Sequence, residues 1–183
     1  MVKTSIYLRT AFIFSFLLVL SSCLSVKPGA TKSGEKYYET FFVGEEGTQY
    51  FIKPFTFENS KLKEEVHLDL TFRYKNKINS NATINYSLFI NEIIKEVDSI
   101  SIVSSNIIIK STENKLLFNE RVKTNFKSRF STEAPLSSLK QLFENENWEI
   151  QVYANNKIHV FRTTKKTRKK IKALNDNVFI LFD

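Results

Sequence analysis

Residues 65–75 read EVHLDLTFRYK, and this stretch decides the fold class. Every second residue is apolar or aromatic, and the residues between them are polar or charged. The apolar positions are Val66, Leu68, Leu70, Phe72 and Tyr74. Strict alternation with a period of two is typical of a β-strand that buries one face and exposes the other. We therefore predict a half-buried strand here.

Similar stretches continue on both sides and predict a chain built mainly of strands. We expect strands at residues 37–43, 49–57, 82–90, 99–103, 106–111, 116–130, 148–154, 157–163 and 177–182. Residues 91–98 fit a short helix as well as a strand. Pro54 predicts an edge position or a bulge, because proline cannot donate to a ladder. Asn155 and Asn156 predict a two-residue hairpin turn, because asparagine tolerates positive φ.

Two segments have helical spacing. The first segment, residues 135–145, begins with Pro135. Proline suits a first helical turn because its missing N–H would be unpaired there anyway. Residues 165–174 follow Thr164, a favourable N-cap. The fold class is therefore mainly β. We expect an antiparallel β-sandwich or a curled open sheet with one or two short helices, and a half-barrel is the alternative.

The N-terminus has the order of a secretory signal peptide. Lys3 and Arg9 precede the apolar run AFIFSFLLVL at residues 11–20, and small residues follow. This basic, apolar and small sequence is the plan of a cleaved signal. The apolar run is ten residues long, whereas a helix that spans a bilayer needs roughly 20. We expect removal of the signal rather than a permanent transmembrane anchor.

Residues 20–23 read LSSC and end in the chain's one cysteine, Cys23. This stretch resembles the lipobox of bacterial lipoproteins, and the resemblance covers residues 1–23 alone. It implies that the thiol of Cys23 receives a diacylglycerol and that cleavage occurs just before it. Leu24 replaces the aspartate that favours inner-membrane retention in such proteins, so the resemblance implies the outer membrane and a periplasmic orientation, with surface display left open. An ordinary signal peptide or a short membrane anchor with an incidental cysteine is the competing interpretation.

Composition shifts divide the chain into three parts. Residues 1–22 are the predicted lipoprotein signal peptide. Residues 23–36 are the lipidated cysteine and a flexible tether that contains two of the four glycines and one proline. Residues 37–183 are rich in aromatic residues and form the predicted single β-rich domain. With Cys23 lipidated, no thiol remains for a disulfide.

The excess positive charge lies at the C-terminal end. From residue 157 onward, eight basic and two acidic residues give +6, while the rest of the mature chain is balanced. The basic run KKTRKKIK at residues 165–172 is a candidate contact for an anionic ligand. Its candidate residues are Lys165, Lys166, Arg168, Lys169, Lys170 and Lys172. A merely solubilising face is the alternative, and the export signal argues against nucleic acid.

The residues for catalysis are sparse. No glycine follows Gly47, which argues against phosphate-binding loops, dinucleotide fingerprints and nucleophile elbows. His67 and Asp69 share one strand face, so the carboxylate could orient the histidine as a general base. Two solvated surface residues are the simpler interpretation. Two histidines and no free thiol predict no metal site and no cofactor.

We therefore expect a membrane-anchored envelope lipoprotein with a non-enzymatic binding or structural role. Its expected partner is an envelope protein or an anionic envelope polymer. The alternative is a periplasmic hydrolase acting on cell-wall or glycan material, for which the sequence offers no nucleophile motif. Three polar side chains that converge in one apolar-lined pocket would favour the hydrolase.

Overall fold

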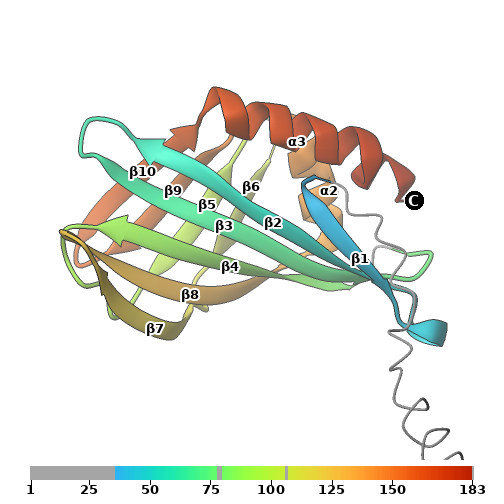
Figure 1. Ribbon diagram of the computed structural model, residues 1–183, viewed down its shortest axis with the longest axis horizontal. Helices are drawn as coiled ribbons and strands as arrows, with labels where there is room; N and C mark the ends of the chain where they lie inside the picture. The colour runs from blue at the N-terminus through green and yellow to red at the C-terminus, as the bar shows by residue number, and fades with distance from the viewer. Residues whose placement is uncertain (1–35, 78–79, 106, 183) are drawn as a thin grey trace, which may run out of the picture. The chain divides into compact units, whose positions relative to one another are not determined.

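The computed structural model describes residues 36–77, 80–105 and 107–182 (Figure 1). The predicted signal peptide, Cys23 and nearly all of the predicted tether lie outside these residues. The strands of the described part are β1 (Tyr38–Phe42), β2 (Thr48–Asn59), β3 (Glu64–Tyr74), β4 (Asn81–Ile90), β5 (Ser99–Val103), β6 (Ile108–Ser111), β7 (Lys115–Val122), β8 (Asn125–Pro135), β9 (Glu149–Ala154) and β10 (Lys157–Thr163). The helices are α2 (Leu136–Phe143) and α3 (Lys165–Asn177), with 3-10 turns η2 (Gly44–Glu46) and η3 (Phe179–Leu181).

All ten strands belong to one antiparallel sheet. Its order is β6-β5-β9-β10-β2-β3-β4-β8-β7, and β1 pairs with β2 beside this path. The sheet curls on itself, and α3 runs across one side of it (Figure 1). A mainly β fold with a curled open sheet and two short helices was one of the predicted alternatives and is confirmed, whereas the two sheets of a sandwich are not formed.

The inward face of β3 shows why the alternation predicts burial. Val66, Leu68, Leu70 and Phe72 are all buried, and their strand pairs with β2 on one side and β4 on the other. The matching positions of β4, from Ile84 to Ile90, are buried in the same way. Removing these side chains from water is the main favourable term in folding.

Aromatic rings fill the interior of the curled sheet. Trp148 packs against Phe55, Phe57 and Phe143, and Phe143 stacks on Phe179 with ring centroids 3.9 Å apart. The indole Nε1 of Trp148 donates to main-chain oxygens at the end of α2. An interior hollow lined by isoleucines from β4, β5 and β6 has a volume of only about 10 Å³. The inside of this sheet is therefore a packed core.

Several local predictions are confirmed. Asn155 and Asn156 have φ values of 50° and 58° and join β9 to β10. The ladder between β2 and β3 shifts register between Ile52 and Phe55, which is the bulge expected from Pro54. The prediction of a short helix or a strand at residues 91–98 is wrong, because this segment is neither.

The prediction of one long strand at residues 116–130 is wrong. The chain reverses at Lys123 and Thr124, and β7 and β8 pair with each other. Lys123 adopts a φ of 57°. Lysine gives no signal for this conformation, so the alternating pattern on both sides looked like one continuous strand.

The prediction of a final strand at residues 177–182 is also wrong. Asn177 ends α3, and the 3-10 turn η3 follows. Phe179 and Phe182 are buried whereas Ile180 and Leu181 between them are exposed, which is a spacing of three rather than two. The two buried phenylalanines of this segment cover the core beside α2.

Candidate functional site

The basic helix α3 is placed by an irregularity in β2. The first half of β2 pairs with β1, and its end pairs with β10 at Phe57 and Glu58. The bulge at Pro54 lies between these two partners. The main-chain oxygens of Lys53 and Pro54 at this bulge accept hydrogen bonds from the ammonium group of Lys170 on α3.

Helix α3 begins as the sequence predicts. The Oγ1 of Thr164 accepts a hydrogen bond of 3.1 Å from the backbone N–H of Thr167, which satisfies an otherwise unpaired donor of the first turn. The hydroxyl of Thr167 donates to the carbonyl oxygen of Thr56 on β2. Ile171 and Leu174 complete the buried face. The helix therefore has a fixed orientation on the sheet.

The opposite face of α3 presents lysines to solvent. Lys165, Lys166, Lys169 and Lys172 are exposed, and three- and four-residue spacing places neighbours on one surface. We call these four residues the lysine stripe. Lys172 pairs with Asp176 at 3.1 Å, but within the described part of the chain no carboxylate lies within 4.0 Å of the other three ammonium groups. The stripe is thus a largely uncompensated positive surface.

The six candidate residues do not act as one group. Arg168 is half-buried and donates to the carbonyl oxygen of Thr163 at 3.3 Å. Lys170 is buried, 4.6 Å from the ring centroid of Phe55 and 5.7 Å from that of Tyr37. Burial, with Lys53 and Lys166 nearby, lowers the pKa of Lys170 to about 8. Lys170 therefore holds the helix and does not belong to the solvent-facing stripe.

A hollow of about 390 Å³ lies beside the first half of α3. It is lined by Pro54, Phe55, Thr56, Glu58, Thr164, Lys165, Lys166, Thr167 and Lys170. Two exposed lysines reach it, and the carboxylate of Glu58 is the one acid in its lining. Its charge suits an anionic group better than a cation.

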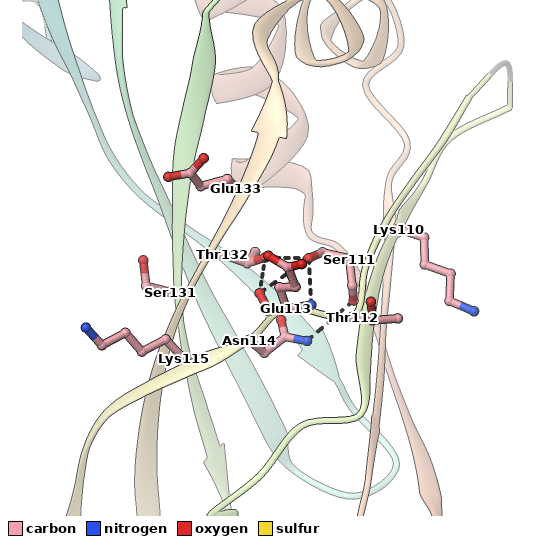
Figure 2. Close-up of a pocket in the computed structure, with 9 residues that line it drawn as sticks. All are labelled: Lys110, Ser111, Thr112, Glu113, Asn114, Lys115, Ser131, Thr132 and Glu133. Carbon is pink, nitrogen blue, oxygen red and sulfur yellow. Dashed lines mark hydrogen bonds between the residues drawn. The ribbon is translucent and has the colours of Figure 1, made fainter.

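A larger open groove of about 650 Å³ lies near the two free edges of the sheet (Figure 2). The hydroxyl groups of Ser111 and Thr132 are 2.6 Å apart, and Thr132 also donates to the carbonyl oxygen of Glu113 at 2.7 Å. Asn114 accepts from the buried Tyr86 hydroxyl at 2.9 Å and donates to the carbonyl oxygens of Val97 and Ser111. These bonds connect β6 to β8 across the opening.

The side chains around this groove do not converge on one point. Figure 2 shows Lys110 and Lys115 pointing away from each other, with Glu133 on a third side. The hydroxyls between them are already bonded to main-chain oxygens and to one another. We interpret the groove as the gap between the edges of the curled open sheet, which these hydrogen bonds bridge.

The proposed pairing of His67 with Asp69 is not formed. His67 Nε2 lies 3.0 Å from a carboxylate oxygen of Glu65, whereas Asp69 pairs with Arg129 at 2.8 Å and accepts from Asn85. Ser87 lies opposite His67 in the ladder between β3 and β4, but its hydroxyl accepts a hydrogen bond of 3.0 Å from Arg129, which also pairs with Asp69. The carboxylate that would orient His67 is therefore held by Arg129 instead.

A buried ionisable pair was not predicted from the sequence. His159 Nδ1 on β10 lies 3.4 Å from the Glu64 carboxylate at the start of β3, and both side chains are buried. The second ring nitrogen of His159 has no partner within the described structure. The signal that could have found Glu64 is its position two residues before Val66, which assigns it to the inward face of the strand.

The described residues contain no group of three or more His, Cys, Asp or Glu side chains that could hold a metal ion. Across residues 36–77, 80–105 and 107–182, no helix has both the length and the apolar character needed to cross a membrane. No protein-family model, no curated protein and no solved structure matches this chain.

Proposed function

We propose that this chain is an outer-membrane lipoprotein of the bacterial envelope with a non-enzymatic role. Diacylglycerol on Cys23 attaches it, the flexible tether links this anchor to the β domain, and the domain faces the periplasm. The domain binds an anionic envelope polymer through the lysine stripe of α3. The resemblance of residues 20–23 to a lipobox supports the anchor, and the stripe supports the ligand class.

The observation that carries the binding role is the grouping of unpaired lysines on one face of a fixed helix. Elsewhere in the described structure, some surface lysines pair with a carboxylate, as Lys127 does with Glu120 at 2.8 Å, and others are unpaired but come from different segments of the chain, as Lys95 and Lys123 do. Lys165, Lys166 and Lys169 lack such partners in the described structure and sit on a helix fixed at its other face. Several fixed cations on one rigid surface attract a polyanion more strongly than the same charges spread over loops.

The test of ligand binding is to replace the four stripe lysines by glutamine. The lipidated protein, held in phosphatidylcholine vesicles, is titrated with heparin as a soluble anionic glycan, and binding is measured at several salt concentrations. We expect at least a tenfold loss of affinity and a shallower salt dependence, because fewer ion contacts are screened. Unchanged affinity would return the stripe to a solubilising role.

The control variant removes the same charge elsewhere. Lys95, Lys110, Lys115 and Lys123 are exposed, lie outside α3 and have no ion pair in the described structure. Replacing these four by glutamine lowers the net charge equally, and we expect heparin affinity within about threefold of the original protein. An equal loss in both variants would mean that total charge, not the helix, attracts the polymer.

The anchor has its own test. With Cys23→Ala, we expect no incorporation of a labelled fatty acid and release from the lipid-anchored membrane fraction. Ser22→Ala is the matched control, because it keeps a small residue before the cysteine and should still be labelled. Fatty-acid labelling that persists without Cys23 would contradict the lipoprotein assignment.

No feature of the described structure favours the hydrolase alternative. The groove of Figure 2 is lined by polar residues, and the hydroxyls of Ser111 and Thr132 in it are bonded to each other. The interior hollow is too small for a substrate. We therefore propose binding rather than hydrolysis.

A further inference from the structure

A set of large apolar side chains remains exposed at one end of the sheet. Phe42, the last residue of β1, is 81 % exposed, and Phe41 and Val43 beside it are exposed as well. The ring of Phe41 meets that of Phe51 edge-on, with centroids 5.5 Å apart. Adjacent exposed aromatic residues on a hairpin are unusual unless something covers them.

The C-terminal segment brings further apolar side chains to the same end. Phe42 is opposite Thr48 in the ladder, and Thr48 is opposite Tyr74. The ring of Tyr74 stacks on Phe182 with centroids 4.1 Å apart. Ile180 and Leu181, just before Phe182, are 66 % and 64 % exposed. We call Phe41, Phe42, Val43, Ile180 and Leu181 the apolar end.

Among the described residues around the hairpin loop, the charges do not oppose contact with a membrane. Glu46 in the hairpin loop pairs with Arg73 on β3. The backbone of Gly47 lies against Lys75, and Lys77 follows in the same exposed turn. These two lysines offset the remaining acid of the loop, Glu45, so apolar side chains are flanked by cations. This combination is typical of surfaces that enter the boundary between headgroups and acyl chains.

The position of the lipid anchor indicates which partner covers the apolar end. Twelve residues lie between Cys23 and Lys36, and β1 begins two residues after Lys36. A flexible chain of this length has a reach of roughly 20 Å. The tether joins β1 at its first residue, Tyr38, and the strand carries the chain from there to Phe42. A bilayer in which Cys23 is anchored is the surface that this end of the domain meets at the highest local concentration.

We infer that the apolar end rests in the interfacial layer of the membrane that holds the lipid anchor. This inference rests on the proposed lipidation of Cys23. The hairpin and the C-terminal turn then orient the domain on the membrane. Because α3 runs away from this end along the sheet (Figure 1), the lysine stripe is left accessible to a polymer.

The experiment measures the depth of single sites in vesicles. The lipidated chain is purified with Phe42→Cys, labelled with a fluorophore on the new thiol, and placed in phosphatidylethanolamine and phosphatidylglycerol vesicles that contain a lipid-borne quencher. Lipidation consumes Cys23, so position 42 carries the one free thiol. Ile158→Cys is the matched control: Ile158 is 64 % exposed and lies beside His159, which contacts Glu64 at the opposite end of β3.

We expect position 42 to be quenched at least about twofold more than position 158, since interfacial side chains sit roughly 5–10 Å into the boundary. Equal quenching at the two sites, with lipid on Cys23 shown by mass spectrometry, would overturn this inference alone. Energy transfer between labelled copies without quenching would overturn it in favour of a second copy. Absence of lipid on Cys23 would overturn the proposed attachment, and this inference with it.

Discussion

The ammonium group of Lys170 donates hydrogen bonds to the main-chain oxygens of Lys53, at 2.5 Å, and of Pro54, at 3.0 Å. The bulge in β2 therefore faces a donor from α3 instead of the next strand. One lysine of the basic run thus holds the helix in place, and its exposed neighbours are positioned by that contact.

Replacing Lys170 by alanine should destabilise the fold by about 1–3 kcal/mol, since two carbonyl oxygens lose their donor and the buried stem loses its packing. Lys169→Ala, one residue away on the exposed face, should change stability by less than about 0.5 kcal/mol. Chemical unfolding of the two variants measures the difference. Equal effects would show that the contact at the bulge contributes nothing to stability.

The same lysine predicts a pH dependence of stability. Burial lowers its pKa from 10.5 to about 8 in the folded chain. Between these values the unfolded chain binds a proton that the folded chain lacks, so the free energy of unfolding should rise with pH from about 8 to about 10. Lys170→Met should remove that part of the rise. Unfolding titrations of both proteins at pH 7.5 and 9.5 check it, and parallel changes would contradict it.

Alternation and turn chemistry predicted most of the strands. Alternation identified the buried faces of β3 and β4, Pro54 identified the bulge, and the two asparagines identified the turn after β9. These signals are local, because each depends on the conformational limits of one or two residues. Long-range neighbours carry no such signal.

The features that were not predicted from the sequence share one physical origin. The turn between β7 and β8 could not be predicted from the sequence, because its residue at positive φ is a lysine and lysine has no preference for that conformation. The contact of Lys170 with β2 depends on a residue more than one hundred positions away. The contact of Glu64 with His159 depends on the first half of β10, which extends beyond its pairing with β2 and reaches the start of β3. Such neighbours are set by the topology of the sheet.

The hairpin that carries the apolar end depends on Gly47. Its φ is 89°, and a Cβ atom there would lie 2.3 Å from the carbonyl oxygen of Tyr74. Gly47→Ala should therefore destabilise the hairpin by more than about 2 kcal/mol and lower quenching at position 42. Gly44→Ala is the control, since its φ of 58° is strained for alanine but no atom lies within 4 Å of the new Cβ. We expect a cost of about 1 kcal/mol there, and a larger cost than at Gly47 would contradict the clash.

The turn between β7 and β8 predicts a stabilising change. Lys123 is exposed and has a φ of 57°, a conformation that costs an ordinary residue about 1 kcal/mol and glycine almost nothing. Lys123→Gly should raise stability by about 0.5–1 kcal/mol. Lys123→Ala removes the same charge but keeps the Cβ atom, so it should give no gain. A gain from alanine equal to that from glycine would assign the effect to charge.

The buried contact between His159 and Glu64 should behave as a coupled pair. Glu64→Ala leaves both ring nitrogens of His159 without a partner in an apolar surrounding, because Nε2 already has none. We expect a loss of about 1–3 kcal/mol, the cost of an unsatisfied buried polar group. The adjacent Glu65, which contacts the half-exposed His67 at 3.0 Å, is the matched control. Glu65→Ala should cost less than about 1 kcal/mol, as exposed pairs do.

A double-mutant cycle separates this contact from the loss of side-chain volume. Glu64→Ala, His159→Ala and the double variant are unfolded under the same conditions, and the coupling energy is calculated from the three changes. A contact between buried side chains predicts a coupling of at least about 1 kcal/mol. Strict additivity would mean that Glu64 and His159 stabilise the fold independently, each through packing against its own strand.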